Sequence, residues 1–152
     1  MISKSFNARM KEFVNYHVNG DGECNTIVLK CWADNHSLSF QERFEIAYFF
    51  AVTYCVESSV VLFQKKSLIE SSPQKFSDLY KQKLIFQSDR KYVKMKNSFE
   101  KCLIQFCKIK NSARFVDQCL DCGVSSLEKA IPVVERWEMF GRFLPFCFAK
   151  CL

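Results

Sequence analysis

The chain has 152 residues, 49% hydrophobic and 15% aromatic, and 22 Lys and Arg against 16 Asp and Glu give it a net charge of +6. This composition supplies ample apolar material for a core and argues against a disordered chain. Only 4 Gly and 3 Pro are present, too few for the many turns of a sandwich or barrel. The excess of cations lies mainly between Lys65 and Lys110. It indicates either a basic soluble protein or a protein with a polyanionic partner.

The cysteines and the N-terminal segment predict a cytoplasmic protein with free thiols. The count of 9 cysteines is odd, and no apolar signal segment precedes them. No apolar run reaches the roughly 20 residues of a membrane helix, because the longest candidate, 46–63, contains Glu57.

The first half of the chain predicts helices around one central helix. Apolar spacing indicates a helix over 5–18. The short apolar segment 24–32 fits a strand or a helix, and a helix is favoured because no second strand is evident. Ser39 and Glu42 form a capping-box pattern that opens a helix over 40–54. That helix is apolar nearly all round, which is typical of a buried central helix.

Further helices are expected along the rest of the chain. A polar interruption at 57–59 predicts a separate short helix over 60–69. Pro73 fits the first position of the next helix, with Ser72 as its cap and Phe76, Leu79, Tyr80 and Leu84 on its inner face. A long helix is expected over 89–109, capped by Ser88 or Asp89, with Tyr92, Met95, Phe99, Cys102, Leu103 and Phe106 on one face. Helices at 111–123, from 125 with an interruption at Pro132, and over 137–144 complete an all-α, compact multi-helix domain spanning 1–152.

The segment after Ser88 is the first candidate site. Arg90, Lys91 and Lys94 follow a predicted helix start, where free N–H groups and the helix dipole already favour anions. Tyr92 lies between these cations and suits stacking on a base beside a bound backbone. The alternative is a solvated lysine-rich face with no ligand.

Other motifs are weaker. Arg142 follows Gly141 in an apolar stretch, so it is either directed into a cleft toward an anion or is a surface arginine at a bend. Cys119-x2-Cys122 and Cys102-x4-Cys107 lack a matching second pair, so we expect buried or idle thiols and no metal site. The chain contains no motif of a serine hydrolase, P-loop, dinucleotide-binding or zinc protease type.

Three segments together resemble a known family. They are ADNHSLS at 33–39, LIFQSDRKYVK at 84–94 and FGRF at 140–143. In this order they are similar to the helical amino acid:DNA transferases of bacteriophages, also called alpha-glutamyl/putrescinyl thymine pyrophosphorylases. The resemblance covers roughly 33–152 and implies a fold distantly like that of the helical DNA glycosylases.

The implied activity is DNA base hypermodification. An amine donor, an amino acid or a polyamine, replaces the phosphate or pyrophosphate of a phosphorylated 5-hydroxymethyluracil in DNA, and no cofactor is expected. The implied catalytic residues, for phosphate contact or as base, are Asp89, Arg90, Lys94, Arg142 and Asp34. The implied DNA-binding residues are Lys91, Tyr92, Lys96, Lys101 and Trp137, with Tyr48 as a further stacking candidate. The alternative is a non-catalytic helical module that binds nucleic acid or protein through a basic face, with the apolar end at 146–152 available to a protein partner.

Overall fold

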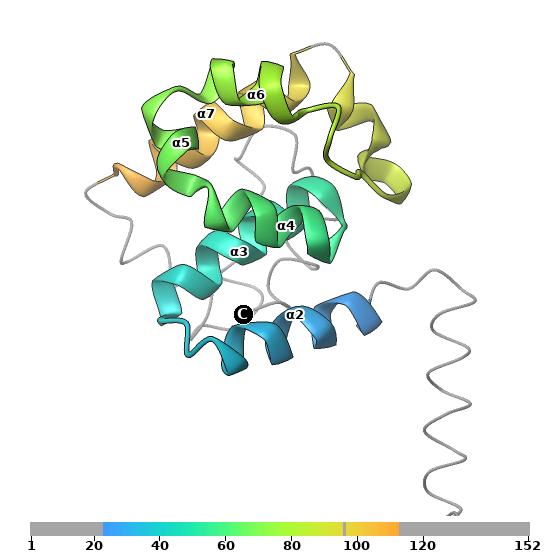
Figure 1. Ribbon diagram of the computed structural model, residues 1–152, viewed down its shortest axis with the longest axis vertical. Helices are drawn as coiled ribbons and strands as arrows, with labels where there is room; N and C mark the ends of the chain where they lie inside the picture. Colours follow the sequence, from blue (N-terminus) through green and yellow to red (C-terminus); the bar gives the residue numbers. More distant parts are fainter. Residues whose placement is uncertain (1–22, 96, 113–152) are drawn as a thin grey trace, which may run out of the picture.

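The computed structural model describes residues 23–95 and 97–112. Within this part the chain is helical and contains no strand, so the predicted all-α class is confirmed there. The elements are α2 (Glu23–Asn35), α3 (Phe40–Thr53), α4 (Val56–Gln64), α5 (Lys66–Ser71), α6 (Pro73–Tyr80), the 3-10 helix η1 (Ser88–Lys94) and α7 (Ser98–Lys110) (Figure 1). The predicted helices at 5–18 and beyond 112 lie outside the described residues.

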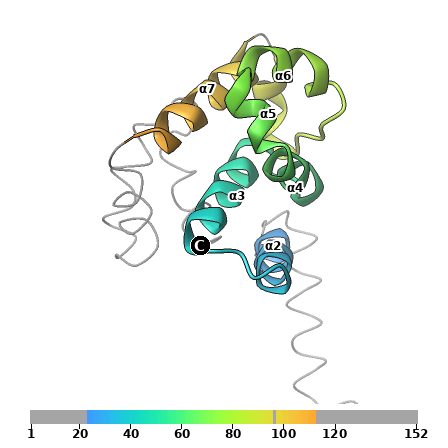
Figure 2. The ribbon, with the colours of Figure 1, turned by 60° about the vertical axis from the view of Figure 1, so that its left-hand side comes forward.

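The central helix is α3, as the sequence predicts. Its residues 44–53 are all buried, and it packs against α4, α7 and η1 (Figures 1 and 2). The predicted capping box is confirmed: the Ser39 hydroxyl accepts the N–H of Glu42, and the Glu42 carboxylate accepts the N–H of Ser39. The helix ends at Tyr54, whose φ of 54° lies in the left-handed region and turns the chain sharply into α4.

The predicted interruption at 57–59 is wrong, because α4 runs through it. The N–H and the hydroxyl of Ser59 both donate to the carbonyl of Cys55, at 2.9 and 2.5 Å. The Ser59 hydroxyl also lies 3.1 Å from that of Thr53. These hydrogen bonds let polar side chains be buried inside a helix. The short helix predicted after the interruption is likewise divided, because the chain turns at Lys65 between α4 and α5.

Helix α6 begins at Pro73, as predicted, and its inner face differs in part from the expected one. Ser72 occupies the N-cap position but makes no side-chain capping hydrogen bond. Phe76 is buried, whereas Leu79 is 64% exposed and so does not belong to the core. The helix ends at Tyr80, and the chain then turns back toward α3.

The predicted long helix over 89–109 is also wrong, because the chain forms two separate helices there. A non-helical stretch ends at Gln87, whose N–H donates to the carbonyl of Thr53 at 2.9 Å and fixes the chain against the end of α3. The 3-10 helix η1 follows, and α7 begins only after Asn97. Within α7 the predicted apolar face is confirmed, since Phe99, Cys102, Leu103 and Phe106 are buried.

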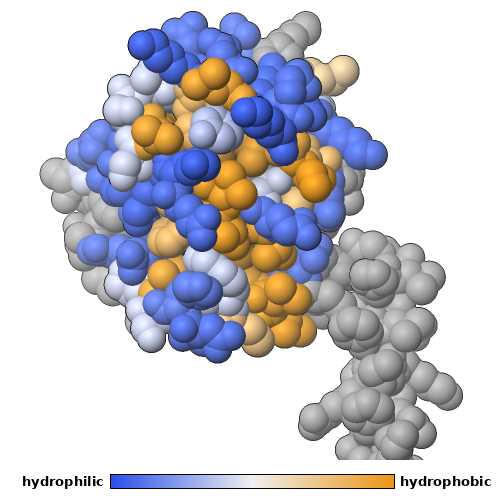
Figure 3. Space-filling model, in the orientation of Figure 1, coloured by the Kyte–Doolittle hydropathy of each residue, from blue (hydrophilic) through white to orange (hydrophobic). Residues whose placement is uncertain are grey.

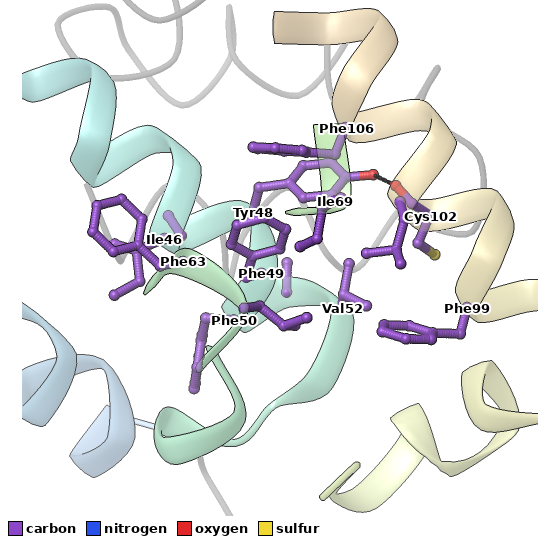
Figure 4. Packing of buried hydrophobic residues seen from close by; sticks show 14 of the residues in the cluster. Ile46, Tyr48, Phe49, Phe50, Val52, Phe63, Ile69, Phe99, Cys102 and Phe106 are labelled. Carbon is purple, nitrogen blue, oxygen red and sulfur yellow. Dashed lines mark hydrogen bonds between the residues drawn. The ribbon is translucent and has the colours of Figure 1, made fainter. Parts of the chain in front are cut away.

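Aromatic rings between α3 and α7 form the centre of the core (Figure 4). Tyr48 is completely buried and donates its hydroxyl to the carbonyl of Cys102 at 2.8 Å. The Phe106 ring lies 4.5 Å from that of Phe49 and 5.5 Å from that of Tyr48, measured between centroids. Tyr48 is therefore a core residue, and its use as a base-stacking platform is excluded in this arrangement.

A buried carboxylate joins α3 to α5 and α7. The Glu45 side chain is 4% exposed, and its two oxygens lie 2.5 Å from Lys66 Nζ and 3.1 Å from Lys110 Nζ. Lys110 also pairs with Glu70, and Lys66 lies 3.9 Å from Glu42. These charges form one network across three helices.

Candidate nucleic-acid interface

The side chains of the 3-10 helix η1 lie along three edges. A 3-10 helix has three residues per turn, so residues three apart share an edge. Among the residues whose side chains the structure describes, Arg90 and Val93 lie three apart, as do Lys91 and Lys94, and Tyr92 is followed three residues later by Met95, which caps η1. Arg90 and Val93 face inward, at 3% and 0% exposure, whereas Tyr92 and Met95 are 45% and 66% exposed. An apolar edge thus lies beside a cationic edge, and we call Lys91, Tyr92, Lys94 and Met95 the η1 surface.

This three-residue repeat explains why two apolar residues point outward. An α-helical repeat would have placed Tyr92 and Met95 on the core face together with Phe99. The 3-10 repeat instead directs Arg90 and Val93 inward, so Tyr92 and Met95 are exposed. The expectation that they belong to the buried face is therefore wrong.

Arg90 lies in the interior and holds Tyr92 from beneath. Its Nη1 donates to the Tyr92 hydroxyl at 2.7 Å, and its guanidinium carbon lies 5.7 Å from the ring centroids of both Tyr92 and Tyr54. Arg90 takes part in further interactions as well. The exposed Tyr92 ring is thereby fixed by a buried charged group, which limits the entropy it would lose on binding a ligand. In this arrangement Arg90 positions Tyr92, and its contact with a phosphate stays a prediction.

The backbone of the segment is fixed to α3 and α4. The N–H of Ile85 donates to the buried Ser58 hydroxyl at 2.8 Å, in addition to the bond between Gln87 and Thr53. Within η1, Arg90 donates to the carbonyl of Gln87 at 2.9 Å. The segment that leads into η1 is therefore attached to two buried residues, Thr53 and Ser58.

Cations and carboxylates are unevenly distributed among the described residues. Lys91 is exposed and Lys94 half-buried, and neither forms an ion pair with any of these residues. Asp34 and Glu45, in contrast, are paired with cations near the start of α3. The η1 surface thus retains positive charge that an external anion can neutralise.

The predicted carboxylate Asp34 lies away from this surface. It pairs with Arg43 at 2.6 Å, beside the first turn of α3, whereas η1 is attached at the last residue of α3. A helix of 14 residues is about 20 Å long, so the two places are separated by about that length. The structure does not bring Asp34 together with Arg90 and Lys94.

The other predicted site residues are only partly placed. Lys101 is exposed in the first turn of α7, the helix that follows η1. Asp89 belongs to η1, but its side chain is outside the description, and the capping position before η1 is Gln87, without a side-chain capping bond. Lys96, Trp137 and Arg142 lie outside the described residues, so the predicted meeting of Arg90 with Arg142 stays a prediction.

The described part of the chain shows neither a metal-binding cluster nor a membrane-spanning helix. No group of three or more His, Cys, Asp or Glu side chains there is placed to hold a metal ion. Cys31, Cys55, Cys102 and Cys107 are free thiols. The motif Cys119-x2-Cys122 lies beyond the described residues. None of the described helices combines the length and apolar character needed to cross a bilayer.

Sequence reasoning missed Tyr54 as a partner of Arg90. Tyr54 lies 36 residues before Arg90 and ends a helix in a left-handed conformation that favours glycine or asparagine. A tyrosine in this conformation can be recognised as unusual only once the end of the helix is known. Comparisons of the chain with protein families, with curated proteins and with solved structures find no match.

Proposed function

We propose that this chain is a helical DNA-binding protein and that the η1 surface contacts the nucleic acid. The observation that carries the proposal is the exposed Tyr92 ring, fixed from beneath by the buried Arg90 and flanked by lysines that form no ion pair with the described residues. Lysines release counterions from phosphates and supply affinity independent of sequence, whereas an exposed aromatic ring stacks on a base. The edge with Lys91 and Lys94 therefore suits the phosphate of a nucleotide, and the edge with Tyr92 suits its base.

The test is a charge substitution on the η1 surface. The variant Lys91→Ala with Lys94→Ala should bind a fluorescent single-stranded oligonucleotide about tenfold more weakly than the natural protein. The dependence of log K on log salt should become shallower by about 1.4, because each lost contact to a single-stranded phosphate removes about 0.7.

The matched control removes the same charge elsewhere. Lys30 on α2 and Lys75 on α6 are exposed and form no ion pair with described residues. The variant Lys30→Ala with Lys75→Ala should keep the natural salt slope. Equal affinity and equal slope in the two double variants would refute a specific role for the η1 surface.

The second candidate is the DNA base-hypermodification transferase implied by the resemblance. Two of the three resembling segments, 33–39 and 84–94, lie at opposite ends of the buried helix α3 and help to fix it. In the reaction, the amine nitrogen forms a bond to the 5-methylene carbon of the base while the bond from that carbon to the phosphate oxygen breaks. The phosphate or pyrophosphate leaves, and the amine proton passes to a carboxylate base. The cations assigned to phosphate contact, Lys94 and Arg142, would stabilise the charge on the leaving oxygen.

The transferase proposal has its own assay. DNA containing phosphorylated 5-hydroxymethyl-deoxyuridine is incubated with the full chain and a panel of amino acids and polyamines, and the nucleosides are analysed by mass. A new aminated nucleoside, lost in the variants Lys94→Ala and Arg142→Ala, is expected. DNA binding without any new nucleoside would leave the binding function and exclude the transferase.

A further inference from the structure

We infer a second anion site, distinct from the η1 surface, formed by Lys65, Tyr80 and Lys83, which takes a phosphate group; we call it the Tyr80 site. The Nζ atoms of Lys65 and Lys83 each lie 5.4 Å from the centre of the Tyr80 ring. The two lysines come from different parts of the chain, one from the junction of α4 and α5 and the other from the turn after α6. The nature of the ligand rests on the proposed function, whereas the site rests on its own geometry.

The donors of the Tyr80 site have no acceptor among the described residues. Neither ammonium group forms an ion pair or a hydrogen bond with a described residue, and the Tyr80 hydroxyl forms no hydrogen bond there. The ring attracts each cation by about 0.5–1 kcal/mol at an exposed position but carries no neutralising charge. Because both ammonium groups lie 5.4 Å from the centre of the same ring, an anion bound beside this ring is attracted by both charges.

The backbone fixes all three residues before any ligand binds. The carbonyl of Tyr80 accepts the N–H groups of Lys83 at 2.8 Å and of Leu84 at 3.1 Å, which closes a tight turn. The N–H of Lys65 donates to the carbonyl of Val61 at 3.1 Å, and its own carbonyl accepts bonds from the start of α5. An arrangement fixed in this way loses little backbone entropy when a ligand binds.

The Tyr80 ring is itself held by the core. It stacks on the buried Phe76 ring at 4.4 Å between centroids, with an angle of 12° between the planes. Figure 3 shows hydrophobic and hydrophilic side chains intermixed on the face of the molecule seen in Figure 1.

A phosphate is the anion that fits this donor set. Its several oxygens can accept from two ammonium groups and a phenol at once. Lys83 lies eight residues before Lys91, and that stretch spans at most about 28 Å even when fully extended. One nucleic-acid strand of moderate length can therefore supply phosphates to both sites.

The experiment compares the natural full chain with the variant Lys65→Ala, Lys83→Ala and with the charge-matched control Lys30→Ala, Lys75→Ala. The first probe is inorganic phosphate, added at constant ionic strength while backbone amide NMR shifts are recorded. Saturating shifts at Lys83 and Leu84 are expected in the natural chain and the control, and their loss is expected in the Lys65 and Lys83 variant.

The second probe is a single-stranded oligonucleotide of about 12 nucleotides, with and without a 5′-phosphate. Binding about tenfold weaker in the Lys65 and Lys83 variant, regardless of the 5′-phosphate, would identify backbone phosphates as the ligand. A loss confined to the 5′-phosphorylated oligonucleotide and to inorganic phosphate would identify a phosphate monoester. No difference from the control with any of these probes would overturn the Tyr80 site.

The outcome is separable from that of the proposed function. If the variant at Lys91 and Lys94 loses DNA binding while the Lys65 and Lys83 variant behaves like its control, only the Tyr80 site is refuted. If inorganic phosphate binds at the Tyr80 site while no DNA binding occurs, the site stands and the DNA-binding function fails.

Discussion

The residue on which the candidate interface depends is Tyr92, because it combines exposure with a fixed position. Its ring is 45% exposed, while its hydroxyl accepts a hydrogen bond from the buried Arg90. The sequence indicated an aromatic residue among cations. It did not indicate the burial of Arg90, since that depends on a 3-10 repeat and on the distant Tyr54 ring.

Two substitutions at Tyr92 distinguish the contribution of the ring to binding from that of the hydroxyl. Tyr92→Phe keeps the stacking face and should change oligonucleotide affinity by less than about threefold, whereas Tyr92→Ala should weaken it by about tenfold, the lower part of the range for one stacked base. Anisotropy titrations at one fixed salt concentration measure both. Equal losses in the two variants would show that binding depends on the hydroxyl held by Arg90 and that the ring face alone is not sufficient.

At the scale of elements, the sequence predicted a helix correctly where its capping residues and its apolar pattern agreed with the burial seen in the structure. Helix α3 has a capping box, an apolar surface all round and a defined end, and its predicted bounds of 40–54 nearly match Phe40–Thr53. Prediction failed at α4, because the Ser59 hydroxyl finds the carbonyl of Cys55 inside the helix. It failed again at η1, because contacts with the distant residue Thr53 fix that segment.

Loss of the α3 capping box should lower the free energy of unfolding by a measurable amount. Ser39→Ala removes the hydroxyl that accepts the N–H of Glu42, and the free energy of unfolding should fall by about 1 kcal/mol. Ser67→Ala, at an exposed position in α5, is the control and should change it by less than about 0.5 kcal/mol. Urea unfolding followed by circular dichroism gives both values, and an unchanged midpoint for Ser39→Ala would contradict a stabilising cap.

At the scale of the whole described fold, the charge network makes stability depend on pH at both ends of the range. The backbone N–H of Ser39, then its hydroxyl, holds the pKa of Glu42 below its ordinary value of 4.5. Burial opposes this lowering of the pKa, and the charges of Lys66 and Lys110 add smaller contributions to it. A lowered carboxyl pKa contributes stability that is present above 4.5 and is lost as the pH falls through the folded-state value.

Lys110 makes stability depend on pH at the alkaline end of the range. Burial favours its neutral form, but the hydrogen bonds to Glu70 and Glu45 and the negative charges of these two carboxylates together outweigh burial and raise the pKa of Lys110 above 10.5. Its contribution is therefore complete below 10.5 and is lost as the pH rises through the folded-state value. Urea midpoints measured across the pH range should form a plateau with an acid and an alkaline limb. Lys110→Ala should flatten the alkaline limb and Glu42→Gln the acid limb, and limbs unchanged in these variants would assign them to other groups.

The same network predicts a non-additive pair of substitutions. Lys66→Ala or Lys110→Ala alone leaves the buried Glu45 with one cation, so each should lower the free energy of unfolding by about 1 kcal/mol. The double variant leaves Glu45 without the two cations that contact its oxygens. A carboxylate that is 4% exposed then lacks both pairing and full hydration, and breaking a buried pair costs about 3–5 kcal/mol.

The double variant should therefore lose more than the sum of the two single losses, and adding Glu45→Gln to it should restore part of the stability. Recovery on Glu45→Gln would show that the loss of stability comes from the unpaired charge and not from a general loss of packing. A double-mutant cycle by urea unfolding measures the coupling. Strictly additive losses, with no recovery on Glu45→Gln, would show that water reaches Glu45 and that the three helices are held together by their apolar contacts alone.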